Sequence, residues 1–372
     1  MVDQPEGTRT RLLVAANNFP PKQGGIERFV DGLARHAWPA ETAAVAPPFL
    51  GAEAHDAAAP FTVRRAPFTG GRPPRWWPAR QAIASALREL SPEHVLCGQP
   101  WPDARALATV RRRGETRSVI CHGTDVALAR AAGGRRRWQM ARTLAAVDVV
   151  IANSAFTAAL AADLGAAPVV INPGVELDAP ADDPAAVRRR LGLGDGPLVV
   201  TVARLVERKG HVPFLAAWAA VREREPEAIW VVVGDGPERE RLAAAAAGTG
   251  GVALVGSRPD TEIQALYRTA AAHVLPGHVA AGEVEGFGMV VVEAGAAGTP
   301  TVATDSGGTA EAVGAGGIVV PEREPRLLAE AIVELLQDGA RRADLGRAAR
   351  ARAELLAWPL VAARFREAVA AH

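Results

Sequence analysis

The sequence predicts an α/β fold composed of two parallel-sheet domains. Short runs rich in Val, Ile and Leu alternate with longer amphipathic stretches along most of the 372 residues. Strands that are apolar on both faces are typical of parallel sheets covered by helices on each side. The alternation stops at a stretch rich in Pro, Gly and Asp, 172–184, and then restarts, which indicates a second unit of the same kind.

The apolar runs predict where the strands and helices lie. Six strands are expected in each half, at 12–16, 43–46, 94–97, 118–121, 147–152 and 169–171, and then at 198–203, 229–233, 252–255, 273–275, 301–303 and 317–320. The clearest helices are expected at 25–37, 79–90, 237–247, 285–297, 325–337 and 357–371. We therefore expect an N-terminal domain at 1–178, a C-terminal domain at 179–356 and a final helical segment at 357–372.

Composition restricts the class of protein. With 49% hydrophobic residues the chain can bury a large core, and a net charge of +1 gives no overall bias toward nucleic acid. No apolar run approaches the roughly 20 residues of a membrane span. Cys97 and Cys121 lie in apolar runs without metal spacing, as buried thiols in a reducing compartment do. Residues 1–7 do not resemble a signal peptide, so we expect a cytoplasmic protein.

The most informative motif is Glu285-Gly-Phe-Gly-Met-Val-Val-Val-Glu293, in which two carboxylates flank a glycine-containing turn. Gly286 and Gly288 allow a ligand to approach the backbone closely. A helix that begins there directs its free amides and its positive dipole end at an anion. A phosphate facing the amides and hydroxyls facing the carboxylates together describe a nucleotide sugar.

A pair of cations follows the strand at 198–203. Arg204 ends that strand and Lys209 is expected to open the next helix, so both would lie at the ligand-binding edge of the sheet. Only Lys22 and Lys209 are lysines among 42 basic residues, which suggests that a compact ammonium is needed at these positions. The planar guanidinium of an arginine and the compact ammonium of a lysine can together bind the oxygens of a diphosphate. The alternative is a solvated basic turn.

Two loops in the first half of the chain are weaker candidates for ligand binding. Gly24 and Gly25 form a strand-to-helix turn that suits a phosphate or sugar, or is a plain structural turn. His122 ends another strand beside a glycine, where it could line the site or cap the strand. We find no strand-terminal Asp-x-Asp pair, no His-Glu-x-x-His and no Walker loop, so we expect no metal and no bound cofactor, only a nucleotide-sugar co-substrate.

Taken in order, these motifs resemble the retaining glycosyltransferases of family 4, which have the GT-B fold. They are Phe-Pro-Pro-x-x-Gly-Gly, His-Gly, Asn172-Pro-Gly-Val, Arg204-x4-Lys209-Gly, Gly-Asp-Gly-Pro, Glu285-x7-Glu293 and Ser-Gly-Gly-x-x-Glu311. The resemblance implies two Rossmann-like domains facing across a cleft, the first for the acceptor and the second for the donor. It also implies a last helix that returns to the first domain.

The resemblance further implies roles for individual residues. Arg204 and Lys209 would bind the donor diphosphate, Glu293 the ribose, and Glu285 the transferred sugar. The amides of Phe287, Gly288 and Met289, beside Gly286, would reach the distal phosphate or the sugar. His122 would lie by the sugar ring, and Gly24 and Gly25 between donor and acceptor.

Within that family, Asn18-Phe-Pro-Pro-Lys-Gln-Gly-Gly-Ile and Glu283-Val-Glu-Gly-Phe-Gly are most similar to the bacterial phosphatidylinositol mannoside mannosyltransferases, which use GDP-mannose and an anionic lipid. A net basic first half fits such an acceptor, and the Arg/Trp-rich segments 72–80 and 135–138 could contact a membrane surface peripherally. Related enzymes use UDP-hexoses or UDP-GlcNAc, or glycosylate small cyclitols and natural products. Both the donor and the acceptor therefore stay open.

Three other functions compete with a hexosyltransferase. A phosphorylase on a similar fold would need a pyridoxal-phosphate lysine, and neither Lys22 nor Lys209 has a suitable context. A nucleotide-sugar epimerase would need no acceptor. A non-catalytic sugar-nucleotide-binding protein is expected to lack one of the site residues, and this sequence keeps all of them.

Overall fold

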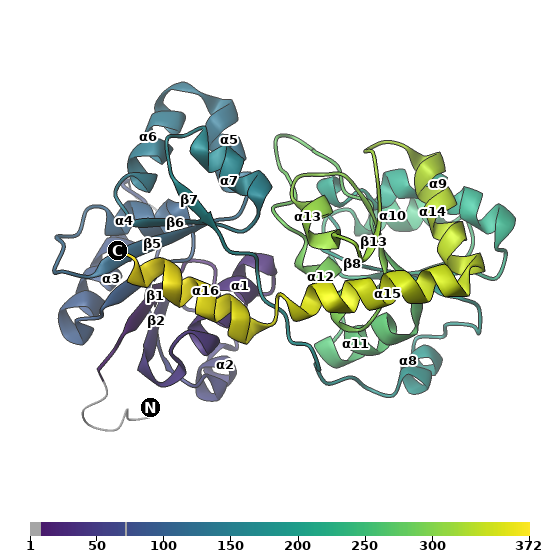
Figure 1. Cartoon of the computed structure of the whole chain (residues 1–372), viewed down its shortest axis with the longest axis horizontal. Coiled ribbons are helices and arrows are strands. Elements are labelled where there is room, and N and C mark those ends of the chain that lie inside the picture. The colour runs from purple at the N-terminus through teal and green to yellow at the C-terminus, as the bar shows by residue number, and fades with distance from the viewer. Residues whose placement is uncertain (1–8, 71–72) are drawn as a thin grey trace. The chain divides into compact units, whose positions relative to one another are not determined.

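The computed structural model describes residues 9–70 and 73–372, and the chain divides into two compact units (Figure 1). The first unit extends to Gly174 and also contains Trp358–His372, while the second is Val175–Ala357. The sequence-based boundaries after 178 and 356 differ from these by only a few residues. Residues 1–7, which do not resemble a signal peptide, and Arg72, the first residue of the Arg/Trp-rich segment 72–80, lie outside the described residues.

The first unit is built on a seven-stranded sheet with the order β3-β2-β1-β4-β5-β6-β7. All of its strand pairs are parallel, and β1, which lies between β2 and β4, is completely buried, as expected for a strand covered on both faces. The strands are β1 (Leu12–Ala15), β2 (Thr42–Ala46), β3 (Thr62–Arg65), β4 (His94–Cys97), β5 (Thr116–Cys121), β6 (Val149–Ala152) and β7 (Pro168–Val170).

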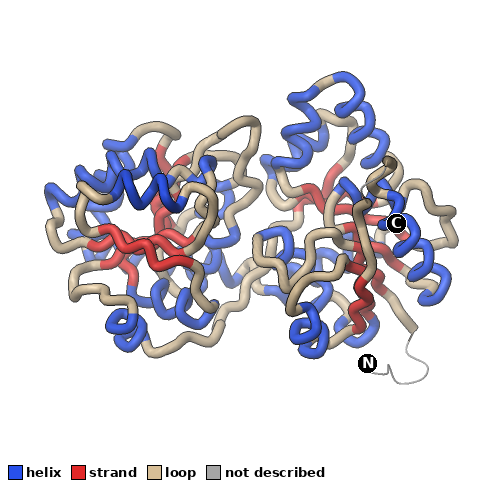
Figure 2. The backbone as a smooth tube through the Cα atoms, turned by 180° about the vertical axis from the view of Figure 1, so that it is seen from behind, coloured by secondary structure: helices blue, strands red, loops and turns tan. Residues whose placement is uncertain are grey.

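Helices flank this sheet in the ribbon and tube views (Figures 1 and 2). The last of them, α16, packs against α1 because the Trp358 ring fits over Gly32, where any Cβ would lie 2.0 Å from it. The helical elements are α1 (Gly25–His36), η1 (Pro39–Glu41), α2 (Ala52–Ala58), α3 (Trp77–Leu90), η2 (Pro100–Ala104), α4 (Arg105–Leu107), α5 (Thr124–Ala132), α6 (Gly134–Leu144), α7 (Ala155–Ala162) and α16 (Trp358–Ala370).

The second unit repeats this plan with a six-stranded parallel sheet of order β10-β9-β8-β11-β12-β13. Its strands are β8 (Leu198–Val202), β9 (Ile229–Val233), β10 (Val252–Gly256), β11 (Ala270–Leu275), β12 (Thr301–Thr304) and β13 (Gly317–Val320). Its helical elements are α8 (Pro184–Arg190), η3 (Glu207–Lys209), α9 (His211–Arg224), α10 (Arg239–Ala246), α11 (Asp260–Thr269), α12 (Met289–Ala296), α13 (Thr309–Val313), α14 (Pro325–Gln337) and α15 (Gly339–Glu354).

The prediction of two Rossmann-like parallel units is confirmed, and two details of it are wrong. The sequence analysis missed β3, a half-buried edge strand that ends in two arginines and lacks a continuous apolar run. It also began one helix at 285, whereas α12 begins at Met289. The reason is Gly288, whose φ of 95° is left-handed and cannot continue a right-handed helix, so Glu285 lies in a loop.

Candidate functional site

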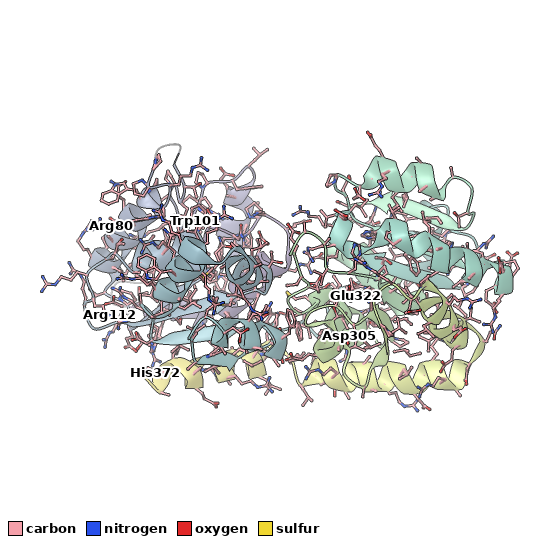
Figure 3. All side chains as sticks on the ribbon, turned by 90° about the horizontal axis from the view of Figure 1, so that it is seen from above. Arg80, Trp101, Arg112, Asp305, Glu322 and His372 are labelled. Atoms are coloured by element: carbon pink, nitrogen blue, oxygen red, sulfur yellow. The ribbon has the colours of Figure 1, made fainter. Side chains whose placement is uncertain are left out.

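The second unit gathers its charged candidates at the carboxyl edge of its sheet. β8 and β11 are neighbours in that sheet, and the loops that follow them carry Lys209 and Glu285. The carboxyl ends of parallel strands meet at one edge, where ligands of open α/β sheets bind. Figure 3 labels Asp305 and Glu322, which follow β12 and β13 at the same edge.

Lys209 and Glu285 form an ion pair, and Arg208 joins it. The Lys209 ammonium bonds to the Glu285 carboxylate, and Arg208 Nη1 lies 3.0 Å from Oε2 of the same carboxylate. Arg208 Nε also lies 3.5 Å from Glu283 Oε2. Only 11% of the Lys209 side chain and 16% of the Glu285 side chain are exposed, so water screens this cluster weakly.

The electrostatics of Glu285 follow from these neighbours. Burial on its own would raise the pKa of Glu285, because a carboxylate loses hydration there. The charges of Lys209 and Arg208 and their hydrogen bonds outweigh burial and hold that pKa below its ordinary value. Glu285 is therefore an anion that pairs with two cations, Lys209 and Arg208, in the place where the sequence predicted an anionic ligand.

Glycines allow these loops to approach one another. Gly210 has a φ of 71°, and a Cβ there would lie 1.8 Å from the Pro276 carbonyl oxygen. Gly307 has a φ of 63°, and its Cβ would lie 2.1 Å from the Glu285 carbonyl oxygen, which accepts a 2.9 Å hydrogen bond from Gly308 N. Larger residues would force these loops apart, so Gly210 lets the Lys209 loop approach the loop after β11, and Gly307 lets the loop after β12 approach Glu285.

The segment after Glu285 leads into α12. Gly286, Phe287 and Gly288 are buried, and the Phe287 ring packs into an apolar cluster that includes Leu275. No side chain caps α12 at Gly288, so the backbone amides at the start of this helix keep their capacity to donate to an anion. Met289 is the first helical residue, and Glu293, which is 9% exposed, follows in the second turn.

Only some of the residues predicted to bind the donor contact one another in the structure. They bring Lys209 and Glu285 together, but Lys209 lies in the 3-10 turn η3 rather than at the start of α9. Arg204 follows β8 by two residues and has an exposed side chain. Arg208 was not among the predicted residues, because its contact with Glu285 joins positions 77 residues apart and leaves no local pattern.

In the first unit, His122 follows β5 at the corresponding edge of the other sheet. Its Nε2 lies 2.7 Å from the Gly98 carbonyl oxygen, and a carbonyl can only accept a hydrogen bond. Nε2 therefore carries the proton, and in the neutral ring Nδ1 keeps a lone pair that can accept from a hydroxyl. Asp125 holds the backbone amide of His122 with both carboxylate oxygens, each at 3.1 Å.

Gly24 and Gly25 lie where β1 leads into α1. Gly25 is the first residue of that helix, and a Cβ on Gly24 would lie 2.4 Å from Glu27 Oε2. Lys22, in the same loop, bonds to Asn18 Oδ1 at 2.6 Å and lies 3.2 Å from Glu27 Oε1. This loop therefore presents two glycines together with a lysine whose side chain is 46% exposed.

The described residues, 9–70 and 73–372, contain neither a cluster of metal-ligating side chains nor a membrane-spanning helix. No group of three or more His, Cys, Asp or Glu side chains in them is arranged to hold a metal ion. None of the helices in the same part of the chain combines the length and the apolar character that crossing a bilayer requires.

Comparison with known proteins identifies both halves of the chain. Residues 23–179 match the family model described as Glycosyltransferase Family 4, and residues 185–352 match the model described as Glycosyl transferases group 1. The GDP-mannose-dependent alpha-(1-6)-phosphatidylinositol monomannoside mannosyltransferase of Mycolicibacterium smegmatis is 34% identical over 369 residues, which cover 91% of this chain and 92% of that protein. The D-inositol 3-phosphate glycosyltransferase of Acidothermus cellulolyticus is 37% identical over 246 residues, 60% of this chain and 53% of that protein.

Solved structures agree on the fold. The crystal structure of Anabaena Alr3699/HepE in complex with UDP and glucose superposes with a TM-score of 0.82 at 18% identity, over 98% of this chain and 100% of that chain. Two Rossmann-like units, the matches to both family models and the near full-length relative lead to one assignment. The chain belongs to the family-4 glycosyltransferases of the GT-B fold.

Proposed function

We propose that this glycosyltransferase transfers mannose from GDP-mannose to an anionic inositol lipid with retention of the α configuration. The observation that carries this proposal is the 34% identity to a phosphatidylinositol mannoside mannosyltransferase across 91% of the chain. We assign donor binding to the second unit, which contains the Lys209–Glu285 cluster, and acceptor binding to the first.

In this proposal the donor diphosphate replaces Glu285 as the partner of Lys209. A diphosphate carries more charge than one carboxylate and presents several acceptor oxygens to Lys209 and Arg208. Arg204, exposed on the same loop, adds a second planar fork for these oxygens. The displaced Glu285 carboxylate is then available to accept hydrogen bonds from hydroxyls of the sugar.

The segment 286–293 completes the donor site. The amides of Phe287, Gly288 and Met289 would donate to the distal phosphate, where the dipole of α12 adds a favourable field. Glu293, one helical turn further on, would accept from the ribose hydroxyls. This order, from the loop before α12 into the second turn of that helix, matches the order of diphosphate and ribose in a nucleotide sugar.

We assign the chemical step to the leaving phosphate and the cations. The bond from C1 of the sugar to the phosphate oxygen breaks, and a bond from C1 to the acceptor oxygen forms on the same face. The acceptor proton passes to the phosphate oxygen that leaves, and the nucleoside diphosphate departs. Lys209, Arg208 and Arg204 stabilise the charge that develops there, so in this proposal they take the place of a divalent metal.

The first unit supplies the acceptor side. His122 Nδ1 can accept from a sugar or acceptor hydroxyl, because Gly98 fixes the proton on Nε2. Gly24 and Gly25 would let the acceptor approach the backbone at the start of α1. The cyclitol-using relative from Acidothermus supports a second candidate, transfer to a soluble inositol phosphate, which shares the inositol phosphate chemistry.

Peripheral membrane contact is the remaining part of the proposal. Trp77 and Trp138 are 45% and 56% exposed, and each lies under an arginine, Arg80 at 4.8 Å and Arg142 at 4.9 Å from the ring centres. Trp101, labelled with Arg80 in Figure 3, is half-exposed on η2, an element packed against α3. Indoles beside arginines suit the headgroup region of an anionic bilayer.

Two measurements test the proposal. In a thermal-shift panel of GDP-, UDP- and dTDP-sugars, GDP-mannose at 100 times its dissociation constant should stabilise the protein by about 2.7 kcal/mol. A larger shift with a UDP-sugar would contradict the assigned base. Nuclear magnetic resonance of the product should then show an α-mannosidic linkage on the inositol lipid, and a β linkage would overturn retention.

Vesicle binding tests the membrane contact. Sedimentation with vesicles that contain phosphatidylinositol should capture the wild type, and capture should fall at least about fivefold in a Trp77→Ala, Trp138→Ala double variant, because the loss of interfacial tryptophans and of their arginine contacts weakens binding. Phosphatidylcholine vesicles are the control. Equal binding to both vesicle types would contradict an anionic membrane surface.

A further inference from the structure

The loop between β1 and α1 is held mainly by side chains. Pro20 and Pro21 have no backbone N–H, so this part of the loop cannot donate to the neighbouring chain. Asn17 N donates instead to the buried Asp103 carboxylate at 3.1 Å and 3.2 Å, and Asn18 Nδ2 donates to Gln99 Oε1 at 2.8 Å. The middle of the loop needs a further anchor.

Arg65, the last residue of β3, provides that anchor. Its Nη2 donates to the Pro20 carbonyl oxygen at 2.7 Å, and its Nη1 donates to the Pro47 carbonyl oxygen at 3.1 Å. The guanidinium carbon lies 5.7 Å from the centre of the buried Phe19 ring. Arg65 thus contacts two consecutive loop residues, and its side chain is only 15% exposed.

Asp56, on α2, fixes the orientation of Arg65. It accepts from Arg65 Nε at 2.9 Å and from Nη2 at 2.6 Å, which is a bidentate pair. His55 Nδ1 lies 3.1 Å from Asp56, and His55 Nε2 lies 3.3 Å from Asp31 on α1. Arg35 faces the same histidine at 3.1 Å and bonds to Asp31 at 2.6 Å.

We propose that Arg65 is a positioning residue for the glycosyl transfer, since it holds the β1–α1 loop in the conformation that presents Lys22, Gly24 and Gly25 to the acceptor. This inference rests on the proposed function for the identity of the acceptor. Its physical reason is the planar fork, whose N–H groups serve Asp56, Pro20 and Pro47 at once. A lysine has one nitrogen and cannot span these three acceptors.

The neighbouring Arg64 offers a matched control. It is also on β3, it is 38% exposed, and its ion pair is with Glu89 on the surface rather than with the loop. The test compares Arg65→Ala, Arg65→Lys and Arg64→Ala in the full chain. Hydrogen exchange reports on the loop amides of residues 17–25, and steady-state kinetics report on the two substrates.

Arg65→Ala and Arg65→Lys should speed exchange of the 17–25 amides at least about tenfold and should lower kcat/KM for the acceptor at least about tenfold, while the KM for the donor changes less than about twofold. Arg64→Ala should match the wild type in both measurements. Arg65→Lys retains the positive charge, so it distinguishes the effect of losing the planar guanidinium from the effect of unfolding.

Three outcomes overturn the inference. They are unchanged exchange in both Arg65 variants, faster exchange with unchanged acceptor kinetics, and full rescue of both by Arg65→Lys. A wild type that transfers no mannose would instead contradict the proposed function, and the exchange measurement would still show whether Arg65 holds the loop.

Discussion

The chain contains one lysine in each unit, and the two lie in equivalent loops. β1 and β8 are each the first strand of their unit and have the same position in the sheet order, and the loop after each leads to a helix. Lys22 follows β1 with 46% of its side chain exposed, whereas Lys209 follows β8 with only 11% exposed. The same topological position thus gives a solvated cation in one unit and a weakly screened one in the other.

The two lysines also differ in their partners, which are local in sequence for Lys22 and distant for Lys209. Lys22 bonds to an amide oxygen of Asn18 and to Glu27, which belong to its own loop and helix. Lys209 bonds to Glu285, 76 residues away, and shares that carboxylate with Arg208. Burial strengthens charge interactions, so the comparison predicts that the second unit carries most of the electrostatic part of catalysis.

The largest expected effect is that of Lys209→Ala. It should retain the fold and lower kcat by at least about 10²-fold, about 2.7 kcal/mol, since it removes a buried charge from the leaving diphosphate. Lys22→Ala should lower kcat/KM by no more than about fivefold, because an exposed pair contributes less than about 1 kcal/mol. Steady-state kinetics with the surface variant Arg341→Ala as a control check both values. Equal losses of activity in the two lysine variants would contradict the difference proposed between the two units.

Glu285→Gln should separate binding from transfer. The amide no longer competes for Lys209 and Arg208, so the affinity for free GDP should rise severalfold, while transfer should fall at least about 10²-fold because a charged acceptor of sugar hydroxyls is lost. Calorimetric titration with GDP and a transfer assay on the same sample measure the two quantities. Tenfold weaker GDP binding would show that Glu285 does not occupy the diphosphate position.

The smallest expected effect is a pH dependence in the first unit. The hydrogen bond with Asp31 is the main cause of the raised pKa of His55, with Asp56 adding to it and with burial and the Arg35 charge opposing it. A raised histidine pKa contributes stability that is present below the ordinary value of about 6.5 and is lost as pH rises through the higher folded-state value.

Thermal unfolding of the wild type and of His55→Gln measures this effect. The wild type should have the higher Tm at pH 6, by about 2 °C for a change of under 1 kcal/mol, and the gap should shrink by pH 9. The Glu285 cluster should show no such change over this range, because the pKa of Glu285 lies below its ordinary acidic value. A gap that widens with pH would contradict the charged state of His55.

Much of this protein could be predicted from local sequence patterns. Buried parallel strands are continuous apolar runs, so β4 and β9 lie where they were expected. The Glu285–Glu293 spacing and the Arg204–Lys209 loop indicated the family that the comparisons identify. The roles assigned to these residues, and the absence of a metal from the reaction, stay predictions until they are tested.

The sequence by itself therefore determined the two parallel units, the family, and which loops carry charge, because these depend on periodicity and on short motifs. The tertiary structure decided the rest: that Arg208 joins the Lys209–Glu285 pair, and that Arg65 reaches Pro20 across 45 residues of chain. Such contacts join residues distant in sequence, and burial then fixes their strength, so no local pattern contains them.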